Sequence, residues 1–123
     1  MMKLARVLTA GAAAAAATLA LGAGAAQASA DPVYLYTSDN ATCTQIGTNG
    51  VAGGVFSSYE CKSGVAGYST LVQPTHGSFS NVYLATLSLA DCNTVGGNGT
   101  SGGVWSSYVC QLGFAGYSLK VSN

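Results

Sequence analysis

The chain has 123 residues, of which 7% are charged, and its formal net charge is zero. A chain of this length has room for one domain. Because basic residues do not outnumber acidic ones, the composition excludes a strongly positive surface that would bind nucleic-acid phosphates or anionic lipids. Seven tyrosines, three phenylalanines and one tryptophan are enough to build a hydrophobic core, which argues against disorder.

The first 30 residues have the pattern of a cleavable export signal. Lys3 and Arg6 form a positive start, Val7 to Ala26 form an apolar stretch, and Ala28-Ser29-Ala30 supplies the small residues that signal peptidase requires. We therefore expect cleavage after Ala30 and a secreted, extracellular product. An uncleaved membrane anchor is the alternative, but the stretch consists mostly of Ala and Gly and would be a weak span.

Residues 31–123 form the expected mature domain, which contains an internal duplication. A shift of 49 residues aligns residues 31–73 with residues 80–122 without a gap, with 22 identities in 43 positions. Residues 74–79 form a short linker between the copies. Solenoids need at least three repeats, so two copies predict a single domain in which each half covers the apolar face of the other. The mature part has two lysines against four carboxylates, and we expect it to bind neither nucleic acid nor membranes.

Each copy predicts a strand followed by a helix. Residues 33–37 and 81–86 are rich in β-branched and aromatic residues, which is typical of strands. Asp39 and Ser88 are good N-cap residues, and Asp91 three residues after Ser88 completes a capping box. A helix should therefore begin after each N-cap.

The expected helices carry a stripe of small residues. Steps of four, three and four place these residues on one face, where they would permit close approach of the helix to a sheet. The alternative is a loop after one or two helical turns, because glycine disfavours helices. The stripe comprises Cys43, Gly47, Gly50 and Gly54 in the first copy and Cys92, Gly96, Gly99 and Gly103 in the second.

Residues 55–61 and 104–110 alternate as strands do, and the alternation predicts that Phe56 and Trp105 point away from the Tyr and Cys side chains. Glycine-containing turns then lead to partner strands at 68–72 and 117–121. The predicted fold class is α+β: two pseudo-symmetric strand-helix-strand-strand repeats that form one antiparallel or mixed sheet of up to six strands, with both helices on one face.

Four cysteines in a small exported domain predict two disulfides. Sequence proximity favours pairing within each copy, Cys43 with Cys61 and Cys92 with Cys110, although pairing between copies also obeys the symmetry. Zinc is the alternative, but the chain has no CxxC pair and a single histidine.

No catalytic constellation is apparent, so we expect a protein that is not an enzyme and has no cofactor. His76, the one imidazole, lies in the linker, whereas a catalytic triad needs a base that another group orients. The carboxylates of Glu60, Asp39 and Asp91 are not repeated between the copies, and no spacing predicts a metal site.

Phe56 and Trp105 are the candidate binding residues, because they occupy equivalent positions. If exposed, they could stack on a sugar ring or anchor in a partner's pocket. If buried, they form the core under the helices, which is the usual place for large aromatics in a small domain. The core interpretation is favoured.

The segment Asp31–Tyr36 and the pattern that runs from Ala41-Thr42-Cys43 to Tyr59, repeated from Ala90 to Tyr108, resemble uncharacterised small secreted disulfide proteins of actinobacteria such as streptomycetes. This resemblance implies no activity. We expect a non-enzymatic extracellular binding or structural protein whose partner is an extracellular protein or a glycan. The alternative is a secreted inhibitor or antimicrobial effector, which would need an exposed rigid loop at the linker or at a glycine turn.

Overall fold

The computed structural model describes residues 31–123, so the expected export signal lies outside the described residues. Within them the order strand-helix-strand-strand occurs twice, which confirms the predicted α+β class and the repeat. The first repeat consists of β1 (Val33–Ser38), α1 (Asn40–Ala52), β2 (Phe56–Gly64) and β3 (Gly67–Pro74). The second consists of β4 (Val82–Leu87), α2 (Leu89–Ser101), β5 (Ser107–Leu112) and β6 (Tyr117–Ser122).

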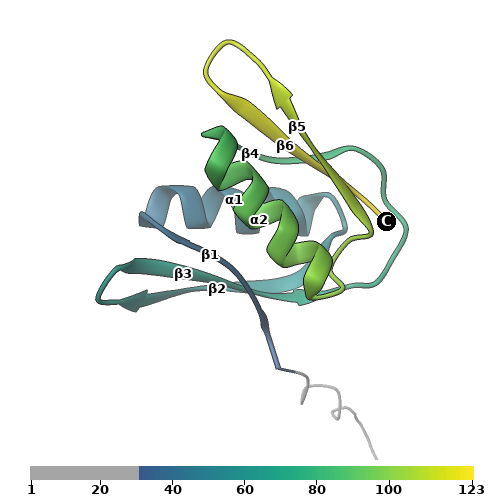
Figure 1. Cartoon of the computed structure of the whole chain (residues 1–123). Helices are drawn as coiled ribbons and strands as arrows, with labels where there is room; N and C mark the ends of the chain where they lie inside the picture. The colour runs from purple at the N-terminus through teal and green to yellow at the C-terminus, as the bar shows by residue number, and fades with distance from the viewer. Residues whose placement is uncertain (1–30) are drawn as a thin grey trace, which may run out of the picture. The chain divides into compact units, whose positions relative to one another are not determined.

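The strands form two separate sheets rather than the single sheet that we expected. Each sheet is antiparallel and has three strands, in the orders β1-β3-β2 and β4-β6-β5. Figure 1 shows both helices between the two sheets. The helix of each repeat also packs against the edge strand of the other, α1 on β4 and α2 on β1. Because these edges are covered by helices, the two sheets do not join.

The helices begin where the N-cap residues predict. The Asp39 carboxylate accepts a hydrogen bond from the backbone N–H of Thr42 at 2.7 Å, and the Ser88 hydroxyl accepts from the N–H of Asp91 at 3.1 Å. These contacts satisfy amides that lack a partner within the helix. Both helices run for 13 residues, so the predicted helix is correct and the short-helix alternative is wrong.

The small-residue stripe brings each helix close to the strand that follows it. A Cβ added at Gly47 would overlap the Tyr59 ring, and one added at Gly50 would overlap the Phe56 ring. The second repeat is equivalent, with Gly96 against Tyr108 and Gly99 against Trp105. Gly54 and Gly103 do not belong to this packed face: they follow the helices at φ 78° and 74°, in the left-handed region that glycine adopts without strain.

The two repeats share one hydrophobic core. Ile46 and Val95 of the helices are fully buried, as are Leu35 and Leu84 of the first strands. Leu35 and Leu84 each lie at a β-bulge, and the carbonyl of each accepts a hydrogen bond from a helix of the other repeat. Neither repeat could bury these groups alone, which is the physical reason that the copies close on each other.

Both disulfides join residues within a repeat, as proximity predicts. Cys43 pairs with Cys61 and Cys92 pairs with Cys110, at Cα–Cα distances of 5.9 and 6.0 Å. Each bond ties the first turns of a helix to the strand after it. In terms of loop-closure entropy, a disulfide that closes a loop of this length stabilises the folded state by about 3 kcal/mol. The described residues contain no free cysteine.

Candidate functional site

The two candidate binding residues lie inside the protein. Phe56 is 1% exposed and Trp105 is 2% exposed, and their ring centroids are 6.5 Å apart. The Trp105 indole N–H donates to the carbonyl of Gly96 at 3.0 Å, so its polar atom has a buried partner. The core interpretation of these residues is confirmed, and the exposed alternative is wrong.

The predicted separation of Phe56 from Tyr59 onto opposite faces is also wrong. The pairing of β2 with β3 shifts register between Phe56 and Ser58, which is a β-bulge. One extra residue reverses the alternation, so both rings contact glycines of α1. In the second repeat Trp105 precedes β5, and Trp105 and Tyr108 both contact α2.

The titratable side chains named in the sequence lie on different elements. Asp39 caps α1, and its hydrogen bond from Thr42 lowers the pKa of its carboxyl. Asp91 lies in the first turn of α2, where its carboxylate is a hydrogen-bond partner of the Tyr36 hydroxyl. Glu60 is exposed on β2, and His76 is exposed in the linker. Among residues 31–123, no group of three or more His, Cys, Asp and Glu side chains could hold a metal ion.

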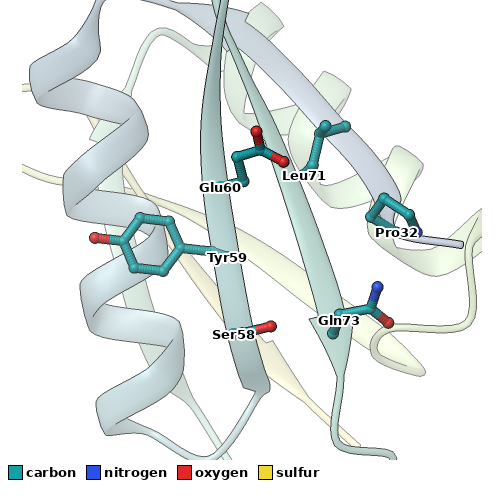
Figure 2. Close-up of a pocket in the computed structure, with 6 residues that line it drawn as sticks. All are labelled: Pro32, Ser58, Tyr59, Glu60, Leu71 and Gln73. Atoms are coloured by element: carbon teal, nitrogen blue, oxygen red, sulfur yellow. The ribbon is translucent and has the colours of Figure 1, made fainter. Parts of the chain in front are cut away.

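A shallow hollow of about 140 Å³ lies on the outer face of the first sheet. Figure 2 shows Tyr59 pointing toward the helix, while Glu60 and Leu71 lie together on the side away from it. In the second repeat the positions of Glu60 and Leu71 hold Val109 and Lys120. The hollow offers one carboxylate beside apolar groups, and its chemistry is not shared by the two repeats. Its lining residues are Pro32, Ser58, Tyr59, Glu60, Leu71 and Gln73.

The two β-hairpin tips carry the most exposed apolar side chains of the described residues. Val65 lies in the turn between β2 and β3, Phe114 lies in the turn between β5 and β6, and both are 109% exposed. Gly67 and Gly116, which close these turns, have φ values of 130° and 142°. A fully exposed phenylalanine gains no stability from burial, and exposed apolar side chains that gather into a contiguous patch can mark an interaction site.

The hairpin end of repeat two, which carries Phe114, has more apolar residues than the equivalent end of repeat one, which carries Val65. Leu87, Tyr117 and Leu112 stand opposite one another across β4, β6 and β5, and Leu112 is 71% exposed. Leu89, at the start of α2, is 45% exposed. We call this set, Leu87, Leu89, Leu112, Phe114 and Tyr117, the apolar end of repeat two.

The sequence analysis did not identify this end. The signal was present in the alignment of the copies, where leucines at 87, 89 and 112 replace Ser38, Asn40 and Ser63. Counting identities emphasises what the copies share, whereas this surface lies where they differ.

Among the residues described, no helix is long and apolar enough to cross a membrane. Two disulfides in a small domain are compatible with an extracellular protein. No protein-family model, curated protein or solved structure was found to match the chain.

Proposed function

We propose that the chain is a secreted, non-enzymatic binding protein that contacts its partner through its β-hairpin tips. One observation carries the proposal: equivalent turns of both repeats present a fully exposed apolar side chain, Val65 or Phe114. Burying such a side chain in a partner stabilises a complex by about 1.5 to 3 kcal/mol. The proposal of secretion rests on the pattern of residues 1–30 and on the two disulfides.

The scaffold holds the tips in place. Each hairpin is attached to a helix by a disulfide through its first strand, at Cys61 or Cys110. The turn of the second hairpin is closed by a hydrogen bond from the N–H of Gly113 to the carbonyl of Gly116 at 2.7 Å. A pre-ordered contact loses less conformational entropy on binding than a flexible one.

The linker is a weaker candidate for the contact than the turns. The Thr75 hydroxyl donates to the carbonyl of Gly54 at 2.6 Å, and Phe79 exchanges two backbone hydrogen bonds with Asn123. These contacts fasten the linker to the domain. The hairpins, in contrast, extend beyond the helices in Figure 1.

A secreted inhibitor or antimicrobial effector that acts on another protein is the second candidate function. The exposed glycine turns favour it, because such a protein needs a rigid exposed loop. In this case the same tip that binds would also block or damage the target. Binding with no change in the target's activity would leave the plain binding function.

The test is expression of the full chain in an exporting bacterium. The expected product in the medium begins at Asp31 and contains no free thiol by mass spectrometry. A variant with serine at both tips, Val65→Ser and Phe114→Ser, should fold with unchanged thermal stability and lose binding to proteins of the medium and cell surface. Retained binding by this double variant would overturn the proposal.

A further inference from the structure

The two repeats differ sharply at the hairpin end of the fold. Across the last row of the first sheet lie Ser38, Tyr68 and Ser63, so Tyr68 stands between two serines. The equivalent tyrosine of repeat two, Tyr117, stands between Leu87 and Leu112.

The differences extend beyond this row. The residue that begins the helix is Asn40 in α1 and Leu89 in α2, and the turn residue is Val65 in one hairpin and Phe114 in the other. All four differing positions of repeat two therefore carry a larger or more apolar side chain.

We propose, on the basis of the proposed binding function, that the apolar end of repeat two is the main contact surface and that it fits an apolar pocket on an extracellular protein. Leu87 and Tyr117 pack against the hydrophobic core, whereas Leu112 and Phe114 extend from it into solvent. The exposed side chains are therefore held in place by residues that pack against the core. Large aromatic side chains that are held in this way are the usual centres of binding energy at interfaces.

The charge of the surrounding elements opposes binding to a membrane. The elements β4, α2, β5 and β6 contain two charged residues, Asp91 and Lys120. The three exposed side chains of the end hold about as much hydrocarbon as a myristoyl chain, which by itself gives only marginal membrane binding. Stable attachment would need a second signal such as a basic patch, and these elements do not supply one.

The size and shape of the end oppose self-association. Figure 1 shows the β5–β6 hairpin projecting beyond α2 as a narrow tip. Two such narrow tips would meet over a small area, whereas stable interfaces bury a total of about 1,200 Å² or more. A phenylalanine tip fits a concave site, where a side chain of this kind can bury about 150 Å² or more.

The experiment compares the two ends by substituting exposed residues at each of them. In the first variant, residues of repeat one replace exposed residues of repeat two: Leu89→Asn, Leu112→Ser and Phe114→Val. The matched control carries Asn40→Ala and Val65→Ser, which change the same end of repeat one. All of these positions are exposed, so thermal unfolding should confirm that both variants fold.

To obtain the partner, the photo-crosslinker benzoylphenylalanine is placed at position 114 of the full chain and, in a second protein, at position 65. Each of the two proteins is then exposed to the surface and secreted proteins of the producing cells. The adduct is identified by mass spectrometry, and the purified partner is titrated with wild type and both variants by calorimetry. The expected result is an adduct at position 114, a loss of affinity of about 100-fold in the first variant and a change of less than about 3-fold in the control.

Each of the following outcomes overturns the inference. If no protein is cross-linked at 114, or if the control loses affinity as much as the first variant, repeat two is not the main contact. In the latter case the binding function of the tips still stands. If neither variant loses affinity, the binding function fails too. If wild type binds phosphatidylcholine vesicles, or forms dimers in sedimentation, in a manner that the first variant abolishes, then the end serves a membrane or a second copy instead.

Discussion

The side-chain amide of Asn49 donates a hydrogen bond to the carbonyl oxygen of Leu84 at 2.9 Å, joining α1 of the first repeat to β4 of the second. The symmetric contact is made by Asn98, which donates to the carbonyl of Leu35 at 2.8 Å. Both acceptors are bulged residues on edge strands, where a carbonyl has no partner within its own sheet. Each repeat therefore completes the backbone hydrogen bonding of the other.

Asn98→Ala should destabilise the domain by about 1 to 2 kcal/mol, because it leaves the partly buried carbonyl of Leu35 without a donor. Alanine favours helices more than asparagine does, so a purely local effect would have the opposite sign. Urea denaturation measures the change, and Asn49→Ala should give a similar value. A variant that is as stable as wild type would show that this bond does not hold the repeats together.

Gly99→Ala should destabilise the domain by about 1 to 3 kcal/mol despite the higher helix propensity of alanine, because the new methyl group would overlap the Trp105 ring. Gly97 provides the control in the same helix, since a Cβ there meets no atom within 4 Å. Gly97→Ala should stabilise the domain by about 0.5 to 1 kcal/mol. Thermal unfolding of the two variants should thus move in opposite directions, and a shared direction would contradict the close packing of α2.

Thr70→Val should stabilise the domain by about 1 kcal/mol or more. Thr70 is fully buried on β3 and its hydroxyl has no hydrogen-bond partner, a situation that costs free energy. Valine has nearly the same shape, and the equivalent position in repeat two holds Leu119, which is also fully buried.

The control for this change is Thr37→Val. The Thr37 hydroxyl bonds to the hydroxyls of Tyr34 and Ser69 at 2.7 and 3.2 Å, so the same replacement should not stabilise there. Guanidinium denaturation of both variants makes the comparison. Equal effects at the two sites would indicate that valine acts through strand propensity alone.

The features that could be predicted from sequence depend on short-range order. The N-caps at Asp39 and Ser88, the disulfide partners 18 residues apart and the glycine steps of the helices are all set by neighbours in the chain. The faces of the strands could not be predicted, because the bulge between Phe56 and Ser58 reverses the alternation and leaves no mark on the sequence pattern.

The division into two sheets was unpredictable for a similar reason. It depends on α1 covering β4 and α2 covering β1, and these contacts join residues far apart in the sequence. Asn49 and Asn98 are identical in the two copies, yet identity alone does not show that each bonds to the opposite repeat. The apolar end, in contrast, could have been found from the replacement of Ser63 by Leu112 and of Asn40 by Leu89.

Stability at alkaline pH should depend on Tyr36, which lies between the two repeats. Burial, the hydrogen bond to Asp91 and the negative charges of Asp91 and Asp39 raise the pKa of Tyr36 from 10.0 to about 12. The unfolded chain therefore releases this proton at a lower pH than the folded chain does. The contribution of Tyr36 to stability is complete below pH 10 and decreases as the pH rises toward 12.

Tyr36→Phe removes the ionisable group, so the free energy of unfolding of this variant should decrease less between these two pH values. Tyr83→Phe, a change of a partly exposed tyrosine on the other sheet, should keep the full decrease. If wild type and Tyr36→Phe lose stability equally over this range in urea titrations, Tyr36 does not sense pH through its contact with Asp91.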